Sequence, residues 1–421
     1  MRTARWSGSL TDILNYTGLP DETPDENGLG GRGEDPPGQQ DERQAVRVCH
    51  IISSFRPLIG GAERATEDLV CELRRLGADV VVLTRHHRGL PRHEHIRGVP
   101  VHRLGLDLPK PLGPLTFIVH ALAWLAVRGR RYPLVHVQNI DAPLLAGMLA
   151  KALLGRSLVV TIHGEKNIVL KKKTTAGRWR VAWMTQLGDV FVALTGPCRR
   201  QYEAQGISPN RIVSIPNGID VGRFRPATTA QKAALRNRMG YEADVPIAMY
   251  AGRLVALKRL DLLIDSWAAL PHADSGHLLI VGDGAEKEKL QALADARGLA
   301  DRVHFVGATD DVLPYYQMAD VFVLPSLYEG LSVALLQAMA CGLCVVVAGS
   351  PGNLAVVQDG VNGLVFPVDK PELLQERLAR ALEDAAMRKR LGQAARQKVE
   401  DTCSIEAVAK SHLAMYQELL V

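Results

Sequence analysis

The sequence predicts an α/β protein made of two doubly wound domains that face a central cleft. Near-continuous apolar runs, typical of strands buried on both faces, recur from residue 46 onward. Helix-like segments separate many of these runs, and this alternation is typical of βαβ units in a parallel sheet. A connector rich in Pro and Gly interrupts the alternation near residues 215–246, after which it restarts.

The expected elements follow in chain order. In the first series, apolar runs predict strands at 46–53, 79–84, 99–104, 134–137, 158–162 and 190–194, and helices at 62–76, 115–128 and 142–154. In the second series, strands are predicted by PIAMYAGRL, HLLIVGDG, DRVHFVG, DVFVLPS and CVVVAGS. Ligands of such open sheets bind at the carboxyl ends of the strands.

The domain boundaries follow from these two series. Residues 1–44, poor in apolar clusters and rich in Asp, Glu, Gly and Pro, are expected to form a disordered N-terminal extension. Residues 45–222 and 223–404 are each expected to form a Rossmann-like domain. Residues 405–421 are expected to form a C-terminal helix that packs across both.

Composition limits the classes of function. The chain has 421 residues, 47% of them apolar, which is enough for a large core. Its 50 Lys and Arg against 45 Asp and Glu give a net charge of +5, too small to indicate nucleic acid as a partner. The longest apolar stretch, 117–127, is too short to span a bilayer, and no signal peptide is evident. A cytoplasmic location is expected, and peripheral contact with the inner face of an anionic membrane is left open.

Neither a metal site nor a dinucleotide site is expected. Cys341 and Cys344 have CxxC spacing without a second pair, and buried thiols are the preferred interpretation. Four histidines fall in a polar segment expected to be a loop, without the spacing of metal ligands: His86, His87, His93 and His95. No GxGxxG follows the first strand, which disfavours a dinucleotide-dependent dehydrogenase.

Two cations mark a candidate phosphate site. Arg253 and Lys258 come just after a buried strand, in the loop that starts a helix. There they can hold a diphosphate and stabilise negative charge on it as it leaves. The alternative interpretation is a solvated basic loop.

The segment LPSLYEGLS provides a second anion-binding feature. Leu331 and Ser332 are expected to open a helix, so that their backbone N–H groups favour an anion. Gly330 lets a ligand approach the backbone. Glu329 can accept hydrogen bonds from sugar hydroxyls, or it can simply compensate the positive end of the helix.

The first series adds two candidates. Gly60-Gly61 follows the first strand and is either a ligand-contacting loop or an ordinary tight turn. His163 follows another buried strand and is either functional or a structural hydrogen-bonding residue.

A basic segment lies further along the first series. It contains the lysines at 171–173 together with Arg178, Trp179, Arg180 and Trp183. A solvated face is the preferred interpretation, and an anionic lipid or acceptor surface is the alternative.

The ordered set IGGAE, TIHGE, IPNGID, GRLVALK, VGDG, HFVG and LPSLYEG resembles the retaining glycosyltransferases of the GT-B fold, family 4 type, over about residues 46–421. The resemblance implies transfer of a sugar from a nucleotide-diphosphate donor to an acceptor hydroxyl, without metal or cofactor and with the anomeric configuration kept. It also implies that the N-terminal domain binds a glycan, lipid-linked or other glycoconjugate acceptor and that the C-terminal domain binds the donor.

The resemblance assigns roles to individual residues. Arg253 and Lys258 match the diphosphate-binding pair, Glu329 matches an acid that touches the transferred sugar, and His163 matches a supporting residue near the reacting centre. The catalytic residues are then His163, Glu329, Arg253 and Lys258, and the donor-binding residues are Gly60, Gly61, Arg253, Lys258, Gly282, Glu329, Gly330, Leu331, Ser332 and Gln337.

Two positions depart from the family pattern. Gln337 stands where the second acid of the Glu-x7-Glu motif usually holds the ribose, and loss of that charge predicts donor binding weaker by about 1 kcal/mol, or unchanged in an adapted site. Leu354 and Ala355 replace the Pro-Glu of a Gly-x-Pro-Glu element, which puts donor selectivity in question.

The alternatives to an active transferase are a catalytically silent nucleotide-binding scaffold of a glycan-assembly complex, or another enzyme on the same architecture, such as an epimerase or a phosphorylase.

Overall fold

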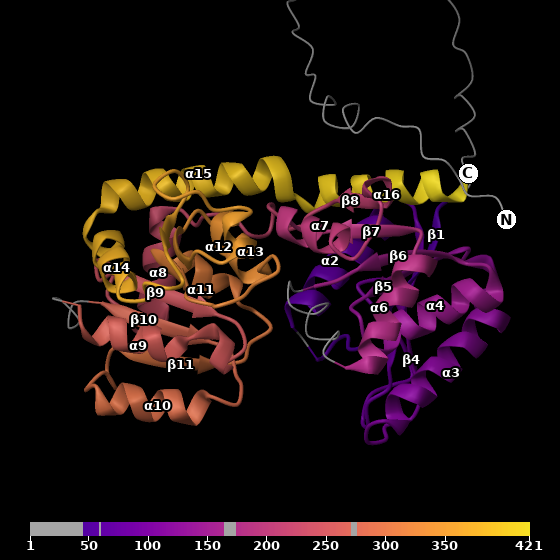
Figure 1. The fold of residues 1–421 in the computed structure, drawn as a ribbon. Coiled ribbons are helices and arrows are strands. Elements are labelled where there is room, and N and C mark those ends of the chain that lie inside the picture. The colour runs from indigo at the N-terminus through magenta and orange to yellow at the C-terminus, as the bar shows by residue number, and fades with distance from the viewer. Residues whose placement is uncertain (1–44, 59, 164–173, 271–275) are drawn as a thin grey trace, which may run out of the picture. The chain divides into compact units, whose positions relative to one another are not determined.

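The chain folds around two separate sheets (Figure 1). The computed structural model describes residues 45–58, 60–163, 174–270 and 276–421. Within these ranges, eight strands form one sheet in the order β3-β4-β2-β1-β5-β6-β7-β8, and six form another in the order β11-β10-β9-β12-β13-β14. All neighbouring strands are parallel except β3 and β4. The predicted α/β class with two Rossmann-like sheets is therefore confirmed, while the predicted extension at 1–44 lies outside the described residues.

The first sheet and its helices are called the N-terminal lobe. Its strands are β1 (Arg47–Ile52), β2 (Asp79–Arg85), β3 (His93–Ile96), β4 (Val99–Leu104), β5 (Leu134–Gln138), β6 (Ser157–Thr161), β7 (Val190–Ala193) and β8 (Ile212–Ser214). Its helices are α2 (Gly61–Arg75), α3 (Leu112–Val127), α4 (Ala142–Leu154), α6 (Thr175–Leu187) and α7 (Gly196–Glu203). The order of the strands reverses between β1 and β5, which makes this the switch point where ligands of such sheets bind.

The second sheet and its helices are called the C-terminal lobe. Its strands are β9 (Ile247–Ala251), β10 (His277–Val281), β11 (Val303–Gly307), β12 (Val321–Leu324), β13 (Cys344–Ala348) and β14 (Leu364–Phe366). Its helices are α8 (Thr229–Arg238), α9 (Leu260–Ala268), α10 (Lys287–Ala296), α11 (Leu313–Met318), α12 (Val333–Ala340), α13 (Pro351–Leu354), α14 (Leu373–Glu383) and α15 (Ala385–Cys403). Here the strand order reverses between β9 and β12.

Two elements differ from the sequence-based expectation. His93 and His95 do not lie in a loop, because residues His93–Ile96 form β3, an edge strand antiparallel to β4. Its four residues, HEHI, include only one buried side chain, so the apolar pattern of a strand is missing. In the connector at 215–246, residues Thr229–Arg238 form α8, which begins with a capping box between Thr228 and Gln231.

The last helix of the chain, α16 (Ile405–Leu420), packs against the N-terminal lobe. The backbone of Ile219 bonds to Cys403 and Ile405 on either side of the break between α15 and α16. From there α16 contacts α2, and Met415 and Tyr416 join the apolar core around β1 and β2. Figure 1 shows α15 and α16 following one another in yellow. The predicted boundaries at 222 and 404 remain predictions.

A partly buried ionic cluster attaches α8 to the second sheet. Asp320 precedes β12, and its carboxylate accepts hydrogen bonds from Lys232 and Arg236, both at 2.6 Å, and from the Ile247 backbone N–H at 2.8 Å. Burial raises the pKa of Asp320, but the two cations and the N–H outweigh it and bring the pKa below its ordinary value.

Replacing Asp320 by Asn is expected to lower the free energy of unfolding by about 3 kcal/mol, because two cations lose a buried partner. A carboxyl whose folded pKa is lowered stabilises the protein above its unfolded pKa of about 3.9 and loses this contribution as the pH falls through the folded value. Urea unfolding at pH 7 and at pH 2, well below the ordinary carboxyl pKa, measures both effects. The exposed Asp295→Asn variant is the control, and equal stability of the two variants would contradict the role of the cluster.

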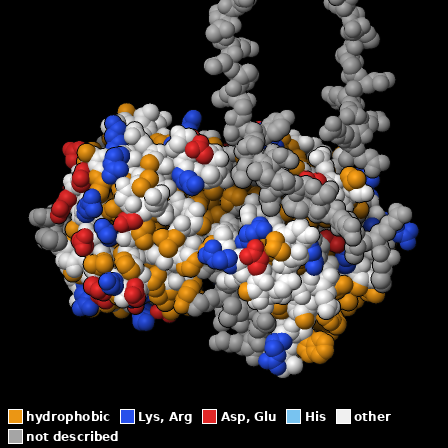
Figure 2. Space-filling view, turned by 45° about the horizontal axis from the view of Figure 1, so that its top comes forward, with side chains coloured by type: hydrophobic (Ala, Val, Ile, Leu, Met, Phe, Trp, Pro, Cys, Tyr) orange, Lys and Arg blue, Asp and Glu red, His pale blue; other side chains and the backbone are white. Residues whose placement is uncertain are grey.

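The coloured part of the face in Figure 2 carries charges of both signs among apolar side chains. This mixture fits the small net charge of the sequence. Among the described residues, no helix combines the length and the apolar character needed to cross a bilayer.

Candidate active site

The switch point of the C-terminal lobe brings Lys258 and Glu329 together. Lys258 follows β9 in a short 3-10 helix, and Glu329 follows β12, the neighbouring strand. Their side chains form an ion pair in which Lys258 Nζ donates to Glu329 Oε1. The side chains are 20% and 11% exposed, so the pair is partly withdrawn from water. Two residues that are 71 positions apart in the sequence therefore meet at one edge of the sheet.

Arg253 lies in the same loop after β9. Its side chain is exposed, and within the described part of the chain no carboxylate forms an ion pair with it. The buried Tyr250 hydroxyl donates to the Arg253 carbonyl at 3.0 Å and holds the loop to the strand. Burial raises the pKa of Tyr250, the Glu329 charge raises it further and the Arg253 charge opposes this, so both charges act on one hydroxyl. Arg253 is thus an uncompensated cation close to the Lys258–Glu329 pair.

The helix after Glu329 begins later than predicted. Leu331 and Ser332 do not open it, because α12 starts at Val333 and Ser332 is its N-cap, whose Oγ accepts from the Leu335 N–H at 3.4 Å. The Leu331 carbonyl accepts a hydrogen bond of 2.9 Å from Asn217 Nδ2. The cap orders the start of the helix next to Glu329, and anion binding by this segment stays a prediction.

Gln337 lies within α12 and is 5% exposed. Its Oε1 accepts a hydrogen bond of 3.2 Å from the Tyr316 hydroxyl, which is itself fully buried. One of its hydrogen-bonding groups is therefore used inside the lobe. A contact between the rest of the amide and a ribose stays a prediction.

The glycines of the predicted site differ in what constrains them. At Gly282 a Cβ would lie 1.9 Å from the Gly252 carbonyl oxygen, so the approach of two neighbouring loops requires glycine there. At Gly352 a Cβ would lie 1.8 Å from the Gly330 carbonyl oxygen, so the backbone of α13 packs directly against the segment that carries Glu329. At Gly61, by contrast, a Cβ would meet no described atom within 4 Å beyond its chain neighbours and its own helix. Packing among the described residues does not explain that glycine, and its contact with a ligand stays a prediction.

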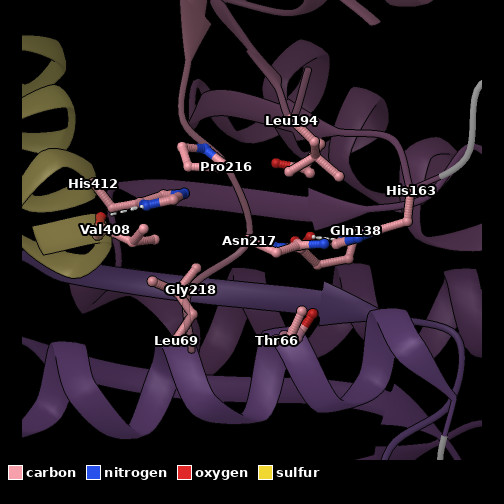
Figure 3. A pocket seen from close by; sticks show the side chains of 12 residues that line it. Thr66, Leu69, Gln138, His163, Leu194, Pro216, Asn217, Gly218, Val408 and His412 are labelled. Atoms are coloured by element: carbon pink, nitrogen blue, oxygen red, sulfur yellow. Dashed lines mark hydrogen bonds between the residues drawn. The ribbon is translucent and has the colours of Figure 1, made fainter. Parts of the chain in front are cut away.

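His163 comes two residues after β6 in the N-terminal lobe. Its Nε2 lies 2.8 Å from Gln138 Oε1 at the end of β5 (Figure 3). Burial lowers the pKa of His163 to about 4, so the imidazole is neutral at pH 7. Both residues line a small cavity of about 20 Å³, together with Thr161, Asn217 and His412, and this volume holds about one water molecule.

The two lobes also touch through α2. Arg64 is 9% exposed, and its Nη2 lies 3.5 Å from the Asp310 carbonyl oxygen in the loop after β11. Arg56 Nη1 lies 3.7 Å from the Asp310 carboxylate, and α2 contacts α12. The helix that starts at Gly61 therefore lies against the C-terminal lobe.

Two residues of the site, Gln138 and Asn217, are absent from the sequence-based prediction. Gln138 ends the strand LVHVQ, and the rule that indicates His163, a polar residue at the carboxyl end of a buried strand, applies to it equally. Asn217 lies in the motif IPNGID, whose composition indicates only a connector. Its side chain hydrogen-bonds to the Leu331 carbonyl, 114 positions away in the sequence, and no local sequence pattern predicts such a contact.

Several remaining predictions concern thiols, metals and the basic segment. Cys341 and Cys344 are buried free thiols whose pKa burial raises to about 12. In the part of the chain that the structure describes, no group of three or more His, Cys, Asp and Glu side chains is placed to hold a metal ion. Trp179 and Trp183 are exposed on α6, and the lysines at 171–173 lie outside the described residues.

Sequence comparison decides the class of the protein. Residues 60–218 match the glycosyl transferase 4-like domain, and residues 231–398 match the glycosyl transferases group 1. A D-inositol 3-phosphate glycosyltransferase from Streptomyces bingchenggensis is 30% identical over 406 residues, with 85% of each chain covered. The chain belongs to the GT4-type glycosyltransferases of the GT-B fold.

Two further similarities support this membership. A GDP-mannose-dependent monoacylated alpha-(1-6)-phosphatidylinositol monomannoside mannosyltransferase from Corynebacterium glutamicum is 32% identical over 374 residues, which covers 86% of this glycosyltransferase and 95% of the relative. Among solved structures, a sucrose-phosphate synthase from Thermosynechococcus elongatus has a TM-score of 0.78 at 26% identity, covering 89% of this chain and 99% of that one. The family resemblance found in the sequence is confirmed.

Proposed function

We propose that this glycosyltransferase moves a sugar from a nucleotide-diphosphate sugar to a hydroxyl of a glycan, lipid-linked saccharide or other glycoconjugate, with retention of the anomeric configuration and without a metal ion. The observation that carries the proposal is the meeting of Lys258 and Glu329 at the switch point of the C-terminal lobe, next to the exposed Arg253. The relatives at 30% and 32% identity are named for sugar transfer, and one of them for a nucleotide-sugar donor, which supports this function over a silent scaffold.

The donor diphosphate is proposed to lie against Arg253, Lys258 and the N-terminal end of α12. Two cations and backbone N–H groups at one site neutralise the charge that builds up on the diphosphate as the bond to the sugar breaks. Glu329, an acceptor of hydrogen bonds when ionised, is placed to hold sugar hydroxyls. The donor then competes with Glu329 for Lys258, because the two side chains are already paired.

Retention is proposed to proceed on one face of the sugar. A covalent intermediate on Glu329 is not part of this proposal. The leaving diphosphate can accept the proton of the acceptor hydroxyl on the same face. The neutral His163 is then assigned to hydrogen bonding and orientation of the sugar, and general-base catalysis is not required of it.

Replacing His163 by Ala is expected to lower kcat about tenfold, the value of one hydrogen bond of about 1.4 kcal/mol. Donor KM and the affinity for the nucleoside diphosphate are expected to change less than twofold, because the cations that hold the diphosphate are untouched. Steady-state kinetics and calorimetry separate the two quantities. An unchanged kcat would remove His163 from the site.

Peripheral contact with an anionic membrane is proposed for the face formed by α3 and α6. Leu112, Leu115 and Val119 are each more than half exposed on α3, a helix without charged residues, and Trp179 and Trp183 are exposed on α6. Both helices contact α4 and so share one side of the lobe. Exposed apolar and aromatic side chains of this kind suit a lipid interface, and α6, which carries two Arg and no acidic residue, favours an anionic one. Cosedimentation with vesicles of phosphatidylglycerol should exceed that with phosphatidylcholine, and equal partition would contradict the contact.

The identity of the nucleotide-sugar donor is the most informative property to measure. Purified protein is incubated with a panel of nucleotide sugars, and release of the nucleoside diphosphate is followed with and without candidate acceptors. Turnover of at least one donor is expected, and mass analysis of the product identifies the sugar. No turnover with any donor, together with nucleotide binding, would favour the scaffold instead. A covalent pyridoxal phosphate in the absorption spectrum would favour a phosphorylase.

A further inference from the structure

A cluster of buried polar side chains lies directly behind His163. It comprises His50 of β1, His136 and Gln138 of β5, Thr161 of β6, and His412 and Tyr416 of α16, all at most 4% exposed. We call it the buried histidine cluster. It lies at the switch point of the N-terminal lobe and includes two residues from the last helix of the chain.

The histidine rings of this cluster are neutral. Burial lowers the pKa of His50 to about 3 and that of His412 to about 4, and it lowers the pKa of His136 as well. A neutral imidazole has one N–H donor and one bare nitrogen acceptor. Fixing the proton on one ring therefore fixes which of its two nitrogens donates and which accepts.

The contacts within the cluster form an ordered chain that begins at His163. Gln138 Oε1 accepts from His163 Nε2 at 2.8 Å, which turns the Gln138 amide nitrogen toward His50 Nδ1 at 3.3 Å. His50 Nδ1 is then the acceptor, and His50 Nε2 donates to the Tyr416 hydroxyl oxygen at 3.4 Å. These directions follow from the orientation of the Gln138 amide.

The chain continues beyond Tyr416. The Tyr416 hydroxyl lies 2.6 Å from His136 Nδ1, and His136 Nε2 lies 2.7 Å from Thr161 Oγ1. Each hydroxyl can donate or accept, so the Gln138 orientation sets the directions only as far as Tyr416. One further contact, 3.4 Å between the Gln138 amide nitrogen and His136 Nε2, is a hydrogen bond when His136 Nε2 is the bare ring nitrogen. The contacts from His163 through Gln138 and His50 to Tyr416 are satisfied by a single assignment of protons.

We propose that Gln138 is a positioning residue for sugar transfer: it holds His163 in the Nε2–H tautomer and in one ring orientation, and Tyr416 on α16 keeps the Gln138 amide turned for this task. The inference rests on the proposed role of His163. It gives α16, which follows the C-terminal lobe in the chain, a part in positioning His163 of the N-terminal lobe. Local sequence patterns do not reveal this, because the contacts join residues 88 and 366 positions apart.

The competing explanation is that the cluster only stabilises the lobe, as satisfied buried polar networks can. The two explanations differ in a double-mutant cycle, because a residue that acts through His163 has nothing to act on once His163 is gone. Gln138→Leu is expected to lower kcat about fivefold with donor KM within twofold. In the His163→Ala background the same substitution is expected to leave kcat unchanged. A fivefold loss in both backgrounds would overturn the proposal.

Tyr416→Phe provides a second variant if Gln138→Leu folds poorly. Loss of its hydroxyl is expected to lower kcat about threefold in the wild type and not in the His163→Ala background. The matched control is Tyr202→Phe, since Tyr202 is equally buried in the same lobe and its hydroxyl donates to the Val192 carbonyl instead. The control is expected to keep the wild-type kcat, and equal losses in the two Tyr→Phe variants would contradict the proposal.

The tautomer of His163 can be measured by NMR in the resting protein, without enzymatic turnover. Long-range 1H–15N NMR of the histidine rings is expected to show His163 protonated at Nε2 in the wild type and a mixture of tautomers in Gln138→Leu. A wild-type protein that turns over no donor would contradict the proposed function and leave this result standing. An active enzyme with His163 protonated at Nδ1, or with identical spectra for both proteins, would contradict the positioning role alone.

Discussion

Replacing Lys258 by Ala is expected to lower kcat/KM for the nucleotide sugar by about 100-fold or more. Two effects act in the same direction. The diphosphate loses a cation that stabilises its developing charge, a contribution of about 3 kcal/mol in sites of this kind. Glu329, only 11% exposed, also loses its partner and presents an uncompensated carboxylate to the incoming diphosphate. Steady-state kinetics over a range of donor concentrations measures the loss.

Lys289→Ala is the matched control for this prediction. Lys289 lies in the same lobe, is 77% exposed and pairs only with Glu286 one helical turn away among the described side chains. Surface pairs of this kind contribute little, so the control is expected to retain the wild-type kcat/KM. Equal activity of the Lys258 and Lys289 variants would remove Lys258 from the donor site.

Replacing Glu329 by Gln is expected to lower kcat about 100-fold while nucleoside diphosphate binding becomes about threefold tighter. The amide keeps the shape of the side chain but loses the charge-assisted hydrogen bonds to sugar hydroxyls. The same change releases Lys258 from its ion pair, so the cation is available to the diphosphate. Kinetics and calorimetric titration of the nucleoside diphosphate measure the two opposite effects.

The opposite signs make the Glu329 prediction specific. A loss of nucleotide affinity equal to the loss in kcat would mean that Glu329 holds the site together and does not act on the sugar. Thermal unfolding of the variant controls for this, because a collapsed site would also lower the melting temperature. Wild-type kcat in Glu329→Gln would contradict the proposed contact with the sugar.

Strands buried on both faces are predictable because their apolar character is local. VFVL and CVVVA, which form β12 and β13, carry the signal within four or five residues. β3 lacks this signal, since an edge strand shares few of its side chains with the core. α8 lies in a polar stretch and is held by Lys232 and Arg236 bonding to Asp320, more than 80 residues away.

The sequence predicts those residues of the candidate site whose position is determined by the end of a buried strand. Arg253, Lys258 and Glu329 each follow a buried strand, and the neighbouring positions of β9 and β12 then explain why two of them meet. The buried partners are not predictable in this way. Gln337 bonds to Tyr316 and Gln138 bonds to His163 through packing of elements distant in sequence.

Calorimetric titration of UDP, GDP and ADP into the wild type and into the Arg253→Ala/Lys258→Ala double variant tests the central claim most directly, because that claim is that these two cations hold the donor diphosphate. The wild type is expected to bind at least one of the three nucleotides, and the double variant is expected to bind the same nucleotide at least about 100-fold more weakly. Binding of equal strength to both proteins would contradict the account.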